Sequence, residues 1–110
     1  MLYVGKRRRT NFNRHHLLFQ KAYWSKKAYG RALRDNFVYL MEVGKHDKLH
    51  EMLHDIPIPS AEELERIWCV YSSQKDYVDT LNAREACLWL AEVSNFEPFC
   101  AVMRYQATLL

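Results

Sequence analysis

The chain is poor in the residues that interrupt regular structure, with three glycines and three prolines among 110 residues. This low content argues against a disordered chain, and 49% of the residues are hydrophobic, which is enough for a core. No run of about 18 apolar residues occurs, which excludes a transmembrane helix. The first residues carry their charges after a very short apolar run, unlike a signal peptide. We therefore expect one folded domain, residues 1–110, in the cytoplasm.

Cysteine is equally scarce. The three cysteines, Cys69, Cys87 and Cys100, fall at apolar helical positions and form no Cys-x2-Cys pair. No Cys-x2-Cys pair is therefore present to hold a structural zinc ion. Buried free thiols in a reducing compartment are the favoured interpretation.

Acidic residues are absent from positions 1–34, which hold ten lysines and arginines. Residues 56–110 have the opposite balance, with four basic and eight acidic side chains. The basic first half predicts a polyanionic partner, with nucleic acid first and DNA favoured. The acidic second half would suit a basic protein partner. Ordinary solvated lysines and arginines are the alternative explanation of this charge.

Short segments of both regular types are predicted before residue 55. Asp35 and Asn36 carry a turn signal, and Gly44 should end a strand. The expected elements are a strand within 12–19, a helix over 25–34, a strand over 37–43 and a helix over about 45–54.

Prolines mark the one internal boundary, Ile56-Pro57-Ile58-Pro59, because a residue before proline is pushed to an extended conformation. About three helices should follow it. Two begin with capping-box patterns, Ser60 to Glu63 and Asn82 to Glu85. Asn95 could cap the last one, with Pro98 in its first turn. The aromatic residues expected in the core are Trp68, Trp89, Phe96, Phe99 and Tyr105.

Four histidines are the most informative residues of the chain. His15 and His16 are adjacent, so on a strand they point to opposite faces, whereas His46 and His50 share one face of a helix. Neutral imidazole is the commonest protein metal ligand and titrates near neutral pH. One member of the first pair could therefore bind a metal while its neighbour acts as a base. Taken singly, each is more simply a surface or helix-edge residue, and a structural four-histidine zinc site is a rarer possibility.

The segment from Arg14 to His54 resembles the HNH endonucleases, the ββα-metal (His-Me finger) family, and is most similar to the nuclease colicins. The resemblance rests on three elements in family order. They are Arg14-His15-His16-Leu17, Asn36-Phe37-Val38-Tyr39-Leu40 and His46-Asp47-Lys48-Leu49-His50. It covers about 40 residues, from Arg14 to His54. The loop between the first two elements is longer than in compact members of the family.

The resemblance implies that His15, His46 and His50 bind one divalent metal ion. It also implies that His16 is the general base and that Asn36 pins the loop and orients His16. An all-nitrogen donor set favours Zn, Ni, Co or Mn over Mg. The implied fold is α+β: a small HNH-like ββα-metal core in the basic half (1–55), followed by a helical subdomain (56–110). His54 has no role that the resemblance supplies.

Three functions are compatible with these patterns. The first is a small metal-dependent DNA endonuclease of a phage or mobile element. The second is a catalytically silent HNH-like protein that binds nucleic acid or inhibits another nucleic-acid enzyme by protein contact. The third is a helical DNA-binding module with incidental histidines. The candidate phosphate contacts are Arg7, Arg8, Arg9, Arg14, Lys26, Lys27 and Arg31.

Overall fold

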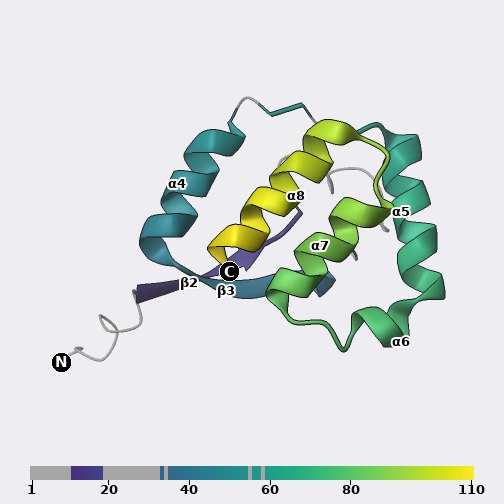
Figure 1. The fold of residues 1–110 in the computed structure, drawn as a ribbon, viewed down its shortest axis with the longest axis horizontal. Coiled ribbons are helices and arrows are strands. Elements are labelled where there is room, and N and C mark those ends of the chain that lie inside the picture. The colour runs from purple at the N-terminus through teal and green to yellow at the C-terminus, as the bar shows by residue number, and fades with distance from the viewer. Residues whose placement is uncertain (1–10, 19–32, 34, 55, 58) are drawn as a thin grey trace.

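The computed structural model describes residues 11–18, 33, 35–54, 56, 57 and 59–110. These residues form a small α+β structure with one two-stranded antiparallel sheet and five helices (Figure 1). The predicted α+β class is confirmed. The strands are β2 (Phe12–His16) and β3 (Val38–Glu42), and the helices are α4 (Val43–Leu53), α5 (Ala61–Ser73), α6 (Lys75–Val78), α7 (Ala83–Val93) and α8 (Glu97–Leu109).

The register of the sheet separates its two faces. Asn13 pairs with Met41 and His15 pairs with Tyr39, so these side chains share one face. His15 and Met41 are buried, which identifies this face as the inner one. Phe12 and Leu40 belong to the opposite face and are exposed. The strand over 37–43 was predicted from its content of Val, Tyr, Phe and Leu, and its two faces become distinct only in the folded sheet.

The boundary before β3 differs from the prediction. Asp35 and Asn36 are helical, as is Leu33, and the strand starts at Val38. Leu33 and Phe37 are both buried and stand four residues apart, the spacing of one helix face. Burial of that pair therefore overrides the turn preference of Asp35 and Asn36. The helix predicted over 25–34 otherwise lies outside the described residues.

The second half contains one more helix than predicted. Residues 59–110 are all described and hold four helices, because the single-turn α6 separates α5 from α7. Ile56, Pro57 and Pro59 lie outside any helix or strand, as the proline pattern predicted. The last helix begins after Phe96 and not after Asn95, and it receives no side-chain cap. The hydroxyl of Ser94 instead accepts the Phe96 N–H at 3.1 Å.

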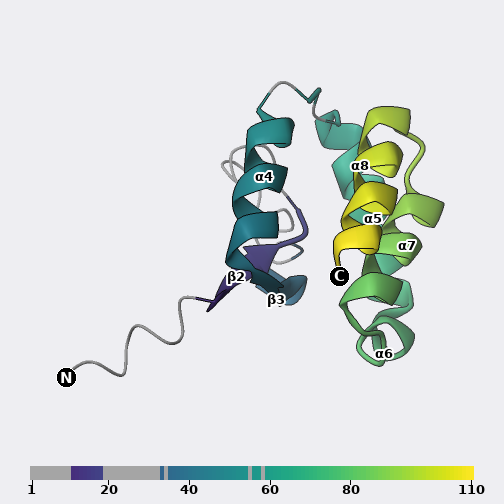
Figure 2. The same ribbon diagram turned by 60° about the vertical axis from the view of Figure 1, so that its left-hand side comes forward.

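One core joins the two halves of the chain. Figure 2 shows α4 and the sheet on one side and α5, α7 and α8 on the other. Phe37, just before β3, packs against the rings of Tyr71 and Trp89, whose centroids are 5.5 and 6.3 Å away. Leu49 and Leu53 of α4 belong to the same buried cluster. Packing against the helical half therefore fixes the position of the sheet and of α4.

Two details of the predicted core need correction. Cys87 and Cys100 are buried free thiols, but Cys69 is exposed. Trp89 and Phe99 are buried as expected, whereas Trp68, Phe96 and Tyr105 are half-buried against the core. No helix in the described part of the chain combines the length and apolar character that a membrane span requires.

Candidate metal centre

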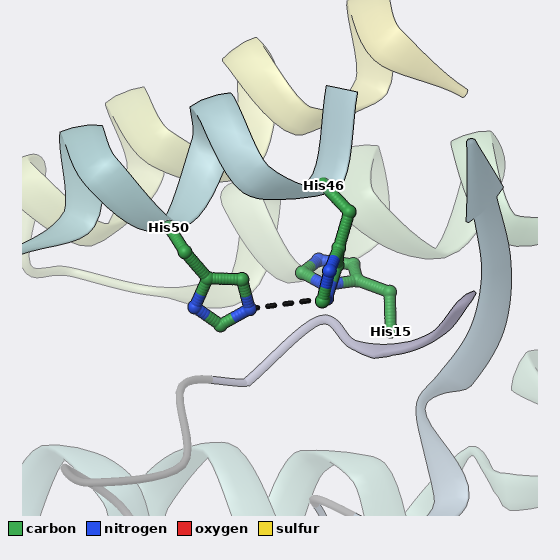
Figure 3. Close-up of side chains that lie close together, drawn as sticks. All are labelled: His15, His46 and His50. Atoms are coloured by element: carbon green, nitrogen blue, oxygen red, sulfur yellow. Dashed lines mark hydrogen bonds between the residues drawn. The ribbon is translucent and has the colours of Figure 1, made fainter. Parts of the chain in front are cut away.

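Three of the four histidines meet between the sheet and α4. β3 runs directly into α4, so the first turns of that helix lie beside the inner face of β2. His46 and His50 are one turn apart on the helix, and His15 projects toward them from the strand (Figure 3). One ring nitrogen from each residue lies within 4.8 Å of the others. The group could hold a metal ion.

The spacing of the ring nitrogens fits a shared ion. The Nε2 atoms of His46 and His50 are 3.1 Å apart. Two imidazole nitrogens on one zinc ion, each about 2.0–2.1 Å from it, lie roughly 3 Å from each other. The ring of His15 lies edge-on to both, with centroids 5.1 Å from His46 and 5.9 Å from His50. Its buried Nδ1 has no hydrogen-bond partner among the described residues.

Burial favours the neutral form of two of these imidazoles. Burial, with added repulsion from His46 and His50, lowers the pKa of His15 to about 4, although the hydrogen bond to Gln106 acts in the opposite direction. Burial and the neighbouring His50 also lower the pKa of His46 below its ordinary value. Only the neutral ring can ligate a metal. At neutral pH these side chains are therefore in the form that binds cations.

The surroundings of the three rings include two residues that the sequence analysis missed. The side-chain amide of Asn13 lies 3.4 Å from Nδ1 of His46, and the amide oxygen of Gln106 is hydrogen-bonded to Nε2 of His15. Strand alternation could have indicated Asn13, two residues before His15. A polar residue on the apolar stripe of α8 could have singled out Gln106, but no local pattern gives its partner 91 residues away.

The proposed base and its orienting residue lie near the cluster but outside it. His16 is half-buried, and strand alternation directs it to the face opposite His15. Repulsion from His16 is a minor cause, after burial, of the lowered pKa of His15 and of His46. Asn36 is exposed and precedes Phe37, whose carbonyl accepts the Leu17 N–H at 2.9 Å. Asn36 is therefore at the end of the sheet that carries His16.

The remaining candidates fall in two groups. Arg14 is exposed on the outer face of β2, and His54 is exposed at the C-terminal end of α4, one turn beyond His50. The other predicted phosphate contacts lie outside the described residues: Arg7, Arg8, Arg9, Lys26, Lys27 and Arg31.

No known protein identifies this centre. The chain matches no protein-family model, no curated protein and no solved structure.

Proposed function

We propose that this chain is a metal-dependent endonuclease that hydrolyses phosphodiester bonds in DNA. The observation that carries the proposal is the convergence of His15, His46 and His50, with His16 next to His15 in the strand but on its opposite face. These are the residues to which the resemblance to the HNH family assigns the ligands and the base. Three imidazoles leave coordination positions open, as catalytic metal sites do. The basic N-terminal sequence supports a polyanionic substrate.

His15, His46 and His50 would hold one divalent ion, with Zn, Ni, Co or Mn preferred over Mg by an all-nitrogen donor set. Bound there, the ion would supply Lewis-acid stabilisation of negative charge on the phosphate. His16 would accept a proton from a water molecule whose oxygen bonds to phosphorus. The bond from phosphorus to the 3′ oxygen breaks, and that oxygen takes a proton from solvent. Asn36, at the same end of the sheet, would hold the backbone around His16.

A plasmid-nicking assay combined with calorimetry tests this proposal. His50 is exposed, so its replacement by alanine should leave the fold intact while removing one ligand. We expect wild type to bind one Zn, Ni or Mn ion and to nick DNA, and His50→Ala to lose both properties. His54→Ala, one turn further along α4, is the matched control and should retain both. Equal metal binding by wild type and a His46→Ala/His50→Ala double variant would refute the metal centre.

A catalytically silent binding protein is the second candidate, and the surface of the helical half favours it. Tyr77 and Leu88 are 57% and 44% exposed, and they line a shallow groove with Glu85 and Glu92. A groove lined by both apolar and acidic side chains suits a basic protein partner. If the purified protein cuts neither DNA nor RNA with Mg, Mn, Ni, Co or Zn, this alternative replaces the nuclease. Substitutions at Leu88 and Glu92 should then abolish function.

A further inference from the structure

Gln106 is a polar residue in the middle of the apolar face of α8. It is completely buried, as are Phe99 and Met103 on the same helix. An amide removed from water is costly unless its polar atoms are hydrogen-bonded. Here both ends of the amide have partners. The oxygen contacts Nε2 of His15, and the nitrogen lies 3.2 Å from the carbonyl oxygen of Leu17 and 3.3 Å from the sulfur of Met103.

These contacts determine which nitrogen of His15 carries its hydrogen. The carbonyl of Leu17 can only accept, so it must face the NH2 group of Gln106. The amide oxygen then faces His15 and also can only accept. Nε2 of His15 must therefore be the donor. Because the neutral ring carries one hydrogen, Nδ1 retains its lone pair.

The nitrogen of His15 that keeps its lone pair, Nδ1, is also the one without a hydrogen-bond partner among the described residues. Nδ1 is buried, and the ring of His15 lies edge-on to His46 and His50. We propose that Gln106 is a positioning residue that holds His15 in the Nε2–H tautomer and thereby presents Nδ1 as the ligand atom. The inference rests on the proposed metal centre. It extends that centre to α8, which lies outside the segment that carries the family resemblance.

A second role of Gln106 follows from its two contacts with the end of β2. Its amide binds both His15 and the carbonyl of Leu17, so it fixes the ring and the end of β2 together. The partner residues that orient metal-binding histidines typically account for 10–100-fold in metal affinity. We expect a loss of that size when the amide is replaced by an apolar side chain.

Nitrogen-15 NMR of the imidazole rings tests the tautomer directly. In metal-free wild type, Nε2 of His15 should carry the hydrogen and Nδ1 should not. Addition of Zn²⁺ should shift the Nδ1 resonance and leave the Nε2 hydrogen in place. A hydrogen found on Nδ1 in the wild-type protein would overturn the inference, whether or not any variant folds.

Three variants separate positioning from packing. Gln106→Leu should mix the two tautomers and weaken Zn²⁺ binding by about 10–100-fold. Gln106→Glu keeps an oxygen acceptor for His15, so it should bind Zn²⁺ more tightly than Gln106→Leu. Gln74→Leu is the control, since Gln74 also uses its amide oxygen as an acceptor, from Trp89 at 3.4 Å, but outside the metal centre. It should bind Zn²⁺ as wild type does.

The outcomes for the inference and for the metal centre are distinct. If wild type and Gln106→Leu bind Zn²⁺ equally tightly, the positioning role of Gln106 is wrong and the centre stands. If wild type binds no Zn²⁺, the metal centre fails and, with it, the assignment of Nδ1 as a ligand. The metal-free spectrum then still decides whether Gln106 sets the tautomer.

Discussion

Two adjacent histidines in β2 occupy different environments. His15 is buried against α4 and α8, whereas His16 is half-buried on the other face of the strand. A strand separates neighbours in this way because successive side chains alternate. One residue can therefore be held as a neutral ligand while the next remains open to substrate and solvent. That division of roles leads to a prediction for His16.

Replacement of His16 by alanine should abolish nicking and leave metal binding intact. The base acts in the transition state, so its loss should lower the rate by about 10²–10⁴-fold without removing a ligand. Single-turnover cleavage measures the rate, and calorimetry with Zn²⁺ measures the affinity. A His16→Ala protein that cleaves at the wild-type rate would exclude His16 as the base. Loss of Zn²⁺ binding in the same variant would instead make it a ligand.

The three cluster histidines were predicted from the sequence, but the contacts that Asn13 and Gln106 make with them were not. The four-residue spacing of His46 and His50 indicates that they share one face of a helix. His15 was singled out because it is adjacent to His16 in the sequence. The histidine partners of Gln106 and Asn13 are recognisable only after folding, because they lie 91 and 33 residues away along the chain. Local spacing cannot encode contacts that tertiary packing creates.

The N-terminal caps of the helices show the same limit of prediction from local sequence. The capping box at α7 is complete, with Asn82 and Glu85 exchanging hydrogen bonds as predicted. At α5 the Ser60 hydroxyl accepts the Glu63 N–H, but the Glu63 carboxylate does not return to the cap. It accepts instead from Arg66, from the Ser94 hydroxyl and from the Asn95 N–H. A distant loop thus competes successfully for a side chain that the local pattern assigned to the cap.

Glu63 therefore ties α5 to the loop between α7 and α8, and its loss should be costly. Burial alone would raise its pKa, but the hydrogen bonds from Arg66, Asn95 and Ser94 outweigh burial and hold the pKa below its ordinary value of 4.5. The unfolded chain then binds its proton first as pH falls. Glu63 should stabilise the fold above pH 4.5 and lose that contribution progressively below it.

Urea denaturation of Glu63→Gln checks this expectation. The side chain is 13% exposed and receives charge-assisted hydrogen bonds, so we expect a loss of roughly 1.5–3 kcal/mol at pH 7. The difference from wild type should shrink as the pH falls below 4.5. Glu62→Gln, in the same helical turn but exposed, is the control and should cost at most a few tenths of a kcal/mol. Equal effects of the two substitutions would show that the contacts of Glu63 with Arg66 and with the loop between α7 and α8 contribute nothing to stability.

Charge is divided between the ends of the whole molecule. The first 34 residues carry ten basic and no acidic side chains, whereas residues 56–110 carry a net charge of −4. In the acidic half, three basic residues are engaged with Glu63, Asp79 and Glu97 in ion pairs. The positive charges of these three basic residues are therefore already partly neutralised by the neighbouring carboxylates. A nucleic acid should consequently interact mainly with the basic N-terminal sequence, and the resulting affinity should depend on salt.

Replacement of Arg7, Arg8 and Arg9 by alanine tests whether these residues contact phosphate. Each phosphate neutralised contributes roughly 0.9 to the slope of log affinity against log salt, so the slope should flatten by up to about three units. The change should be similar for different DNA sequences, since phosphate contacts carry no base information. Electrophoretic shift titrations at several salt concentrations give the slope.

The matched control removes three basic residues from the other half, Lys75, Arg84 and Arg104, and should leave the slope unchanged. If both triple variants flatten the slope equally, binding follows net charge and not the N-terminal sequence. If wild type binds no DNA even at low salt, the groove lined by Tyr77, Glu85, Leu88 and Glu92 becomes the surface to test.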